Sequence, residues 1–149
     1  MSNTKKSPRR VLVAEDEALI RLDIVETLKG AGYEVVADVD NGEAAVEKAL
    51  ELEPDLCVLD VKMPKMDGIT AAEKILKELS CAVVMLTAFS QTELVERARD
   101  AGAMAYVVKP FSPSDLLPAV EIAVSRQAEI LTLEDEIADL SERFEPRKI

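Results

Sequence analysis

The feature of this sequence that most constrains its fold is a regular alternation of short apolar runs with amphipathic segments. The apolar runs have the length of strands and are mostly unbroken: residues 10–15, 33–39, 55–60, 82–87 and 105–109. Unbroken runs are typical of parallel strands that helices cover on both faces. Between them, apolar residues recur at three- and four-residue spacing, which predicts helices over residues 17–32, 41–54, 68–80 and 90–103. This order predicts an α/β fold with a doubly wound, five-stranded parallel sheet and right-handed crossovers.

The ends of the predicted helices carry the residues expected there. Gly32 follows the first helix and Gly102 closes the fourth, both at positions where a helix commonly ends. Asn41 or Asp40 can cap the second helix, and Pro54 stops it. These residues support the boundaries drawn from periodicity.

The C-terminal segment departs from the alternation. From Ser114 the helical pattern runs for roughly thirty residues, about twice the length of the other helices. Pro118 costs little if Ser114 caps this helix, because it then lies in the opening turns, and it bends the helix if the helix begins earlier. Pro146 is expected to end the helix at about Glu145.

One apolar stripe follows the distal part of this helix: Ile130, Leu133, Ile137, Leu140 and Phe144. Such a stripe needs a partner surface, which can be a second copy in a homodimeric coiled coil, a downstream domain, or the chain's own domain. We favour the first two, because the other helices already cover the sheet. The expected organisation is a disordered tail over residues 1–8, a domain over 9–125 and a helical extension over 126–149, either a coiled coil or the start of an output module.

Composition excludes several classes of function. The chain has no histidine, which removes His-dependent hydrolase catalysis and His-based zinc sites. Its two cysteines, Cys57 and Cys81, lie in apolar, strand-like segments without Cys-x-x-Cys spacing, so we expect buried thiols rather than a disulfide or a metal pair. A net charge of −11 opposes nonspecific binding of these residues to nucleic acid or to anionic membranes. With no apolar run of about 20 residues and a polar, basic N-terminal stretch, a cytoplasmic location is expected.

Polar side chains occur where four of the predicted strands end. Glu15 and Asp16 follow the first strand, Asp60 ends the third, Thr87 follows the fourth and Lys109 follows the fifth. The carboxyl ends of parallel strands meet at one edge of a sheet, so these side chains should converge. Three carboxylates without His or Cys match the oxygen-only coordination of Mg²⁺, and without a metal at least one should have a raised pKa.

The same residues can support phosphoryl transfer to a carboxylate, in which a cation and a hydroxyl bind the remaining negative charge. Asp60 is the best candidate nucleophile because it lies alone at its strand end, whereas Glu15 and Asp16 can share metal binding. Lys109 could instead be a surface charge, but Pro110 restricts its backbone and could adopt a cis bond that turns its side chain inward.

Four motifs, "VAEDE", "VLDVKMPKMDG", "LTAF" and "YVVKPF", occur in an order that resembles the receiver domain of two-component response regulators. The resemblance covers about residues 9–125. It implies a flavodoxin-like sheet of order 2-1-3-4-5 and a signalling protein rather than an enzyme. It also implies that Asp60 accepts a phosphoryl group from a phosphohistidine on a sensor histidine kinase.

The resemblance implies a metal site as well. Asp16, Asp60 and the backbone carbonyl of Lys62 would bind Mg²⁺ directly, and Glu15 would act largely through water. Many receivers have Asp where this chain has Glu15, so the extra methylene suggests an altered metal geometry. The cation of Lys62, a variable position, could shield or crowd the phosphoryl group and change the lifetime of the phosphorylated state.

The resemblance further implies a switch. Thr87 and Lys109 would contact the phosphoryl group, and the small Ala88 leaves the pocket open. Rotation of Tyr106 would report phosphorylation on the face built from the fourth helix, the fifth strand and the fifth helix.

The segment from residue 111 onwards is similar to the connector that enters an ANTAR module, a helical RNA-binding domain of antitermination regulators. The similarity stops at about residue 149, where the body of that module would begin. RNA binding would therefore follow only if the native protein is longer.

Three alternatives stay open at this point. A stand-alone receiver would act through protein contacts alone. A phosphatase of the haloacid-dehalogenase type would need a second Asp two residues after Asp60, where this chain has Lys62. An FMN carrier would need phosphate-binding loops and aromatic stacking partners, whereas this chain has acids after its first strand and only 3% aromatic residues.

Overall fold

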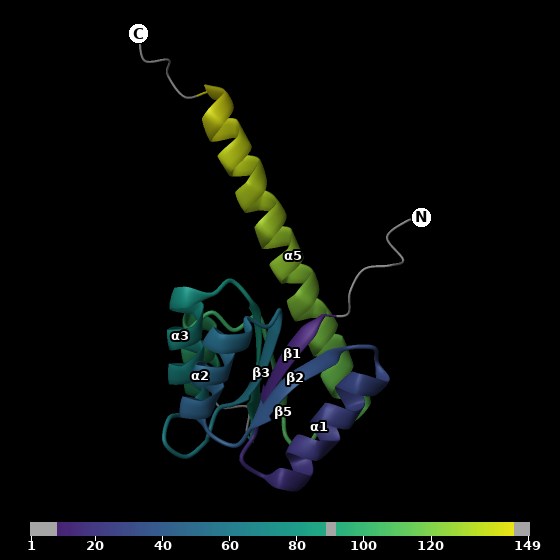
Figure 1. The fold of residues 1–149 in the computed structure, drawn as a ribbon. Coiled ribbons are helices and arrows are strands. Elements are labelled where there is room, and N and C mark those ends of the chain that lie inside the picture. Colours follow the sequence, from purple (N-terminus) through teal and green to yellow (C-terminus); the bar gives the residue numbers. More distant parts are fainter. Residues whose placement is uncertain (1–8, 89–91, 145–149) are drawn as a thin grey trace.

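The chain forms a parallel sheet between two layers of helices, and a long C-terminal helix projects from it (Figure 1). The structure is a computed structural model that describes residues 9–88 and 92–144, without the side chains of 92–95 and 139–144. The predicted tail of residues 1–8 and the predicted helix end at Pro146 lie outside the described residues. The elements are β1 (Arg10–Ala14), α1 (Ala18–Gly30), β2 (Glu34–Val39), α2 (Gly42–Leu52), β3 (Leu56–Asp60), α3 (Gly68–Glu78), β4 (Ala82–Thr87), α4 (Thr92–Asp100), β5 (Ala105–Val108) and α5 (Pro113–Phe144).

The sheet confirms the predicted class and strand order. Its order is β2-β1-β3-β4-β5, and the neighbouring strands pair in parallel. β1 lies between β2 and β3. From β1 the chain goes to β2 on one side, and it then crosses to the other side of β1, where β3, β4 and β5 follow in order. Strand order therefore reverses beside the carboxyl ends of β1 and β3, which is where open α/β sheets bind ligands.

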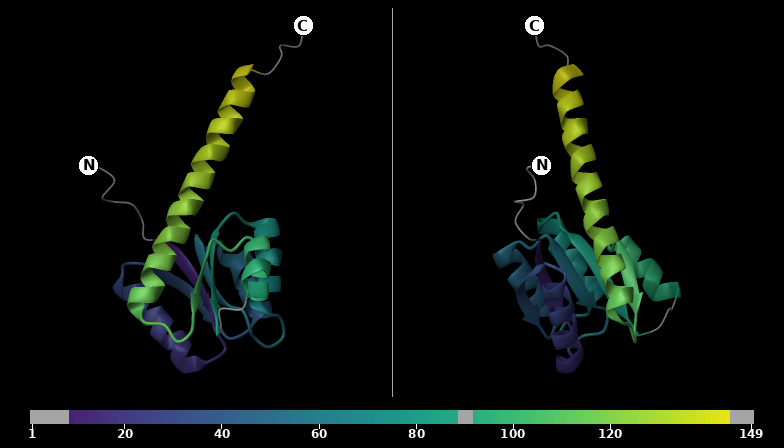
Figure 2. Two further views of the ribbon diagram at one scale, coloured as in Figure 1. Left: turned by 180° about the vertical axis from the view of Figure 1, so that it is seen from behind. Right: turned by 90° about the vertical axis from the view of Figure 1, so that its right-hand side faces the viewer.

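The core consists of two apolar layers because alternate residues of each strand face opposite sides of the sheet. Leu12 and Ala14 pack in the layer of α2, α3 and α4, whereas Val11 and Val13 pack with α1 and α5. The two helix layers lie on opposite faces of the sheet (Figure 2). Interior strands thus bury both faces, which accounts for the unbroken apolar runs of the sequence. Cys57 and Cys81 are free and buried in the first layer, as predicted.

Side-chain caps fix the starts of α2 and α3 beside the carboxyl edge of the sheet. Asn41 caps α2 by accepting the N–H of Ala44 at 2.8 Å, whereas Asp40 accepts a hydrogen bond from the Asn41 amide. Asp67 caps α3 in the same way, accepting the N–H of Thr70 at 2.8 Å. Each cap satisfies an N–H group that has no partner inside its helix.

The long helix begins earlier than its sequence pattern indicated. α5 starts at Pro113, and its cap is Ser112 rather than Ser114. The reason is a reciprocal pair of bonds: the N–H of Ser112 donates to the Asp115 carboxylate at 3.0 Å, and the N–H of Asp115 donates to the Ser112 carbonyl at 2.9 Å. Pro118 lies inside the helix, which continues through it.

The distal half of α5 leaves the sheet and extends away from the domain (Figures 1 and 2). Ile130, Leu133 and Ile137 are 40%, 55% and 65% exposed, so this described part of the stripe does not fold back onto the domain. Leu140 and Phe144, the other two residues of the stripe, are not among those whose side chains the structure describes.

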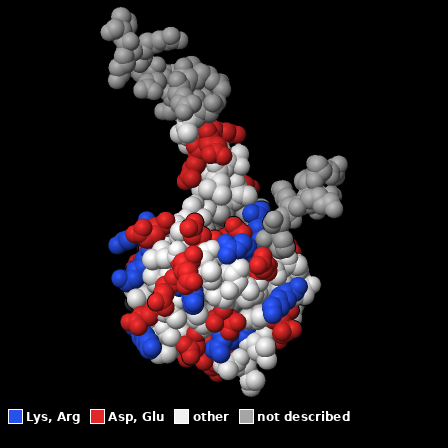
Figure 3. All heavy atoms as spheres, in the orientation of Figure 1, with Lys and Arg blue, Asp and Glu red and all other residues white. Residues whose placement is uncertain are grey.

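Acidic side chains gather near the described end of this projection (Figure 3), where Glu134, Asp135 and Glu136 are exposed. Their charge opposes direct binding of a phosphate backbone by this part of the helix. Among the described residues, no helix has the length and apolar character that crossing a membrane requires.

Candidate functional site

The predicted acidic residues meet at the carboxyl edge of the sheet. Oxygen atoms of Glu15, Asp16 and Asp60 all lie within 4.8 Å of one another. Lys109 joins them, with its Nζ 2.8 Å from Oε1 of Glu15 and 3.1 Å from Oδ2 of Asp60. The lysine is therefore part of this acidic cluster and not an isolated surface charge.

Backbone hydrogen bonds between strands place these side chains. Glu15 directly follows β1, and its N–H donates to the Val39 carbonyl at the end of β2 at 3.0 Å. The N–H of Val61, next to Asp60, donates to the Leu86 carbonyl of β4 at 2.8 Å. The peptide bond between Lys109 and Pro110 is cis, as the sequence suggested it could be.

Gly68 lets the start of α3 approach the acceptor strand. A Cβ at this position would collide with the backbone carbonyl of Asp60, and the Gly68 N–H donates to the Val61 carbonyl at 2.8 Å. Only a residue without a side chain permits this close approach. The glycine of the "MDG" motif thus fixes the loop that follows Asp60.

Burial gives the acidic cluster unusual electrostatics. Glu15 is fully buried and Asp60 is 5% exposed, whereas Asp16 is exposed. Burial, together with the nearby charge of Glu15, raises the pKa of Asp60 to about 7, although Lys109 opposes the change. The prediction that one acid would have a raised pKa is confirmed.

Lys109 responds in the opposite sense. Burial lowers the pKa of its ammonium, but hydrogen bonds and charge attraction from Glu15 and Asp60 outweigh burial, and the net effect raises its pKa. The lysine therefore stays charged at neutral pH. Its ammonium lies between the buried carboxylates of Glu15 and Asp60.

The donor set fits a small hard cation. Three carboxylates converge, and Asp16 leaves one side of the acidic cluster open to solvent. Oε1 of Glu15 is buried and pairs with Lys109 at 2.8 Å, so a single lysine serves two buried carboxylates. Oxygen-only ligands and an acidic cluster that one lysine does not neutralise are the conditions that Mg²⁺ favours.

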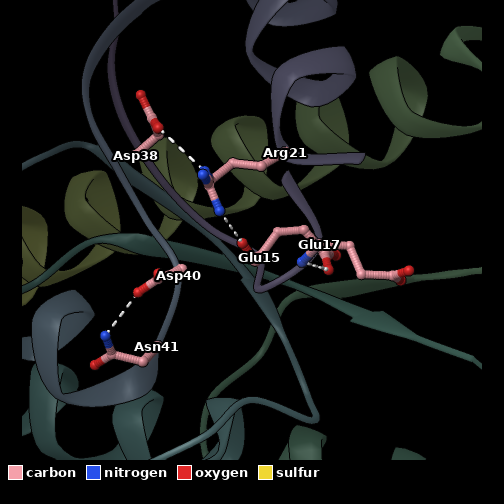
Figure 4. A network of polar contacts seen from close by, with 6 residues as sticks. All are labelled: Glu15, Glu17, Arg21, Asp38, Asp40 and Asn41. Atoms are coloured by element: carbon pink, nitrogen blue, oxygen red, sulfur yellow. Dashed lines mark hydrogen bonds and ion pairs between the residues drawn. The ribbon is translucent and has the colours of Figure 1, made fainter. Parts of the chain in front are cut away.

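The turn between β1 and α1 contains contacts that sequence reasoning missed (Figure 4). Nη1 of Arg21 donates to the Glu15 carbonyl at 2.8 Å, and its Nε lies 3.2 Å from Oδ1 of Asp38. The N–H of Glu17 donates to Oε2 of Glu15 at 3.1 Å. The acidic cluster was predicted from residues at strand ends. Arg21 lies within α1, so that criterion did not include it.

The other predicted site residues differ in how far they are exposed to solvent. Thr87 ends β4 and is 5% exposed, beside the exposed Ala88. The side chain of Lys62 is exposed. Tyr106 lies on β5 and is 46% exposed, where it lines a groove that residues of α4 and α5 also line, among them Arg99 and Ile122. The structure thus separates the acidic cluster from the face where the aromatic residue lies.

Comparison with known proteins supports this arrangement. The family model for the response regulator receiver domain matches residues 11–121. The chain is 61% identical over 142 residues to the transcriptional regulatory protein PdtaR of Mycobacterium tuberculosis, a match that covers 95% of this chain and 69% of that protein. It is 39% identical over 113 residues to the chemotaxis protein CheY of Thermotoga maritima, covering 75% of this chain and 94% of that protein.

Solved structures give the same result. The signal receiver domain of NarL from Mycobacterium tuberculosis superposes with a TM-score of 0.76 at 30% identity, covering 80% of this chain and 98% of that chain. A chain of the CheX–CheY–BeF3–Mg²⁺ complex from Borrelia burgdorferi superposes with a TM-score of 0.75 at 28% identity, covering 80% of this chain and 92% of that chain.

Proposed function

The chain belongs to the response regulator receiver family of phosphorylation-activated signalling proteins, and from this premise we propose that Asp60 is its phosphoryl acceptor. The donor is a phosphohistidine on a sensor histidine kinase, and the acidic cluster binds Mg²⁺ for the transfer. The observation that carries this proposal is a buried carboxylate at a strand end, paired with a lysine and adjacent to two further acids. The family assignment leaves no support for a phosphoesterase or an FMN carrier.

The transfer uses the ionised form of Asp60. A carboxylate oxygen attacks phosphorus, a P–O bond forms, the P–N bond of phosphohistidine breaks, and the imidazole nitrogen keeps the electron pair and takes up a proton. The pKa of about 7 leaves a large share of Asp60 protonated at neutral pH in the metal-free protein. Protonation alone lowers the rate only about twofold, and the missing metal charge beside the phosphoryl oxygens should slow transfer to the metal-free protein much further.

The metal ligands would be Asp16, Asp60 and the backbone carbonyl of Lys62, with Glu15 acting through water. When bound, Mg²⁺ would favour the ionised acceptor and offset the charge on the phosphoryl oxygens. The all-oxygen donor set and the exposure of Asp16 support this assignment. Glu15, longer than the Asp of many receivers, keeps one oxygen on the N–H of Glu17 and one beside Lys109.

Two residues would bind the transferred group. Lys109 now contacts Oδ2 of Asp60, and after transfer it would pair with a phosphoryl oxygen. Thr87 lies at the end of the neighbouring strand, where its hydroxyl would bind another phosphoryl oxygen. Because β4 pairs with β5, movement of Thr87 would reach Tyr106 on the groove of α4, β5 and α5.

The output of this switch passes through α5. We propose that the stripe containing Ile130, Leu133 and Ile137 forms a weak homodimeric coiled coil, and that in a longer native chain this helix leads into an ANTAR-type RNA-binding module for antitermination. The exposure of the stripe supports a partner surface, and the name of PdtaR supports a role in transcription. A stand-alone receiver that acts through protein contacts is the alternative for this last step.

The test of the proposed function is phosphorylation by acetyl phosphate and by a phosphorylated sensor kinase. The wild-type chain should gain one phosphoryl group with Mg²⁺ and little in excess EDTA. Asp16→Ala should lose both metal binding and phosphorylation, and Glu15→Ala somewhat less of each. Unchanged phosphorylation in EDTA would overturn the metal requirement. The matched control is Asp135→Asn, which removes an exposed carboxyl of α5 outside the acidic cluster.

A further inference from the structure

Arg21, near the start of α1, links the turn that carries two of the acids to the end of β2 (Figure 4). Its Nη1 donates to the Glu15 carbonyl at 2.8 Å, and its Nε donates to Oδ1 of Asp38 at 3.2 Å. Its side chain is 22% exposed. The guanidinium of this α1 residue therefore connects the end of β1 to the end of β2.

These contacts help to hold Glu15 on three sides. Its carbonyl accepts from Arg21, its N–H donates to the Val39 carbonyl at 3.0 Å, and its Oε2 accepts the N–H of Glu17 at 3.1 Å. The buried side chain then reaches Lys109 at 2.8 Å. Asp16, the next residue, inherits its position from the same turn, so two of the three acids depend on it.

We propose that Arg21 is a positioning residue for the acidic cluster and that it sets the Mg²⁺ affinity without contacting the metal or the phosphoryl group. This inference rests on the proposed function of the acidic cluster. Asp38 holds Arg21 in place, because its ion pair with Nε fixes the guanidinium while Nη1 donates to the Glu15 carbonyl.

The chemistry of the guanidinium suits this role. Nε and Nη1 are separate donors held in one plane, so they can bind a carboxylate and a carbonyl in different directions at once. A lysine ammonium is a point charge on a flexible stem and does not reproduce that fork. The position should therefore discriminate Arg from Lys, although both carry the same charge.

The test compares Arg21→Lys, Arg21→Gln and Asp38→Asn with wild type in the full chain. Mg²⁺ affinity is measured by calorimetry and by NMR titration of the amides of Asp16 and Glu17. Both Arg21 variants should bind Mg²⁺ more weakly, on the order of tenfold, as expected when a group that orients metal ligands is lost. Asp38→Asn should give a smaller loss in the same direction.

A kinetic and a metal-free readout separate positioning from stability alone. The rate of phosphorylation by acetyl phosphate should need more Mg²⁺ to saturate but should reach a saturated rate within about twofold of wild type. Without metal, hydrogen exchange at the Glu17 amide should be faster in the Arg21 variants than in wild type. Arg126→Gln, an exposed arginine of α5, should change none of these quantities.

Unchanged Mg²⁺ affinity in the folded Arg21 variants overturns the positioning role, even if their stability is reduced. If Arg21→Gln does not fold, Arg21→Lys and Asp38→Asn decide the same question. The proposed function fails in a different way, through a wild-type chain that neither binds Mg²⁺ nor accepts a phosphoryl group. The two failures are therefore distinguishable.

Discussion

Replacing Asp60 with Asn should stabilise the metal-free protein in a pH-dependent way while removing its phosphoryl acceptance. Asp60 is 5% exposed, and burial and the charge of Glu15 raise its pKa from 3.8 to about 7. Between these two values the unfolded chain releases the Asp60 proton and the folded chain keeps it, so stability falls as the pH rises. Above the pKa of Asp60 in the folded protein, the full cost of burying its charge lowers the stability of the wild type. Asn carries no charge and so avoids this cost.

The change in pKa from 3.8 to about 7 sets an upper limit of about 4 kcal/mol on this cost. Asn has its own desolvation cost and is a weaker acceptor for Lys109, so we expect a gain of about 1–3 kcal/mol at pH 8. At about pH 4 the wild-type carboxyl is already neutral, and the gain should nearly vanish.

The assay is urea unfolding followed by circular dichroism, between about pH 4 and 8, with a chelator present. The free energy of unfolding of wild type relative to Asp60→Asn should fall steadily over this range. Asp23→Asn removes an exposed carboxyl of α1 and should change the stability little at any pH. A gain that is equal at both ends of the pH range, or no gain at pH 8, would refute the electrostatic reasoning.

Three further variants, one of them with two substitutions, test other features of the molecule. Lys109→Met leaves two buried carboxylates without their cation and should cost about 3 kcal/mol at pH 8, measured by urea unfolding; it should also abolish phosphorylation-dependent NMR shifts at Tyr106. Gly68→Ala forces a Cβ against the backbone carbonyl that ends β3 and should cost about 2 kcal/mol or more, whereas Gly30→Ala, where a Cβ meets nothing, should not. The double variant Leu133→Asp, Ile137→Asp should leave the domain folded and phosphorylatable but abolish any concentration-dependent mass increase in analytical ultracentrifugation; a wild-type chain that is monomeric at all accessible concentrations would contradict the dimer.

The convergence of the acidic cluster could be predicted because it follows from topology alone. Parallel strands end at one edge of a sheet, so Glu15, Asp60 and Lys109 had to lie near each other once the strands were recognised. The strands were recognisable because burial on both faces makes them continuous apolar runs, as in residues 56–60 and 82–87.

The parts that sequence reasoning missed depend on contacts between elements or on a choice between equivalent residues. Arg21 and Asp38 lie 17 positions apart, on a helix and a strand, and no local pattern connects them. Ser112 and Ser114 are equally good caps by residue type, and the reciprocal bond with Asp115 decides between them only in three dimensions.

The direct test of the central claim is identification of the phosphorylated residue. The wild-type chain is phosphorylated by acetyl phosphate with Mg²⁺, the acyl phosphate is reduced with borohydride, and the modified peptide is sequenced by mass spectrometry. We expect modification at Asp60 and no modification of the intact Asp60→Asn variant under the same conditions. Modification at another residue at the wild-type rate, in either protein, would contradict it.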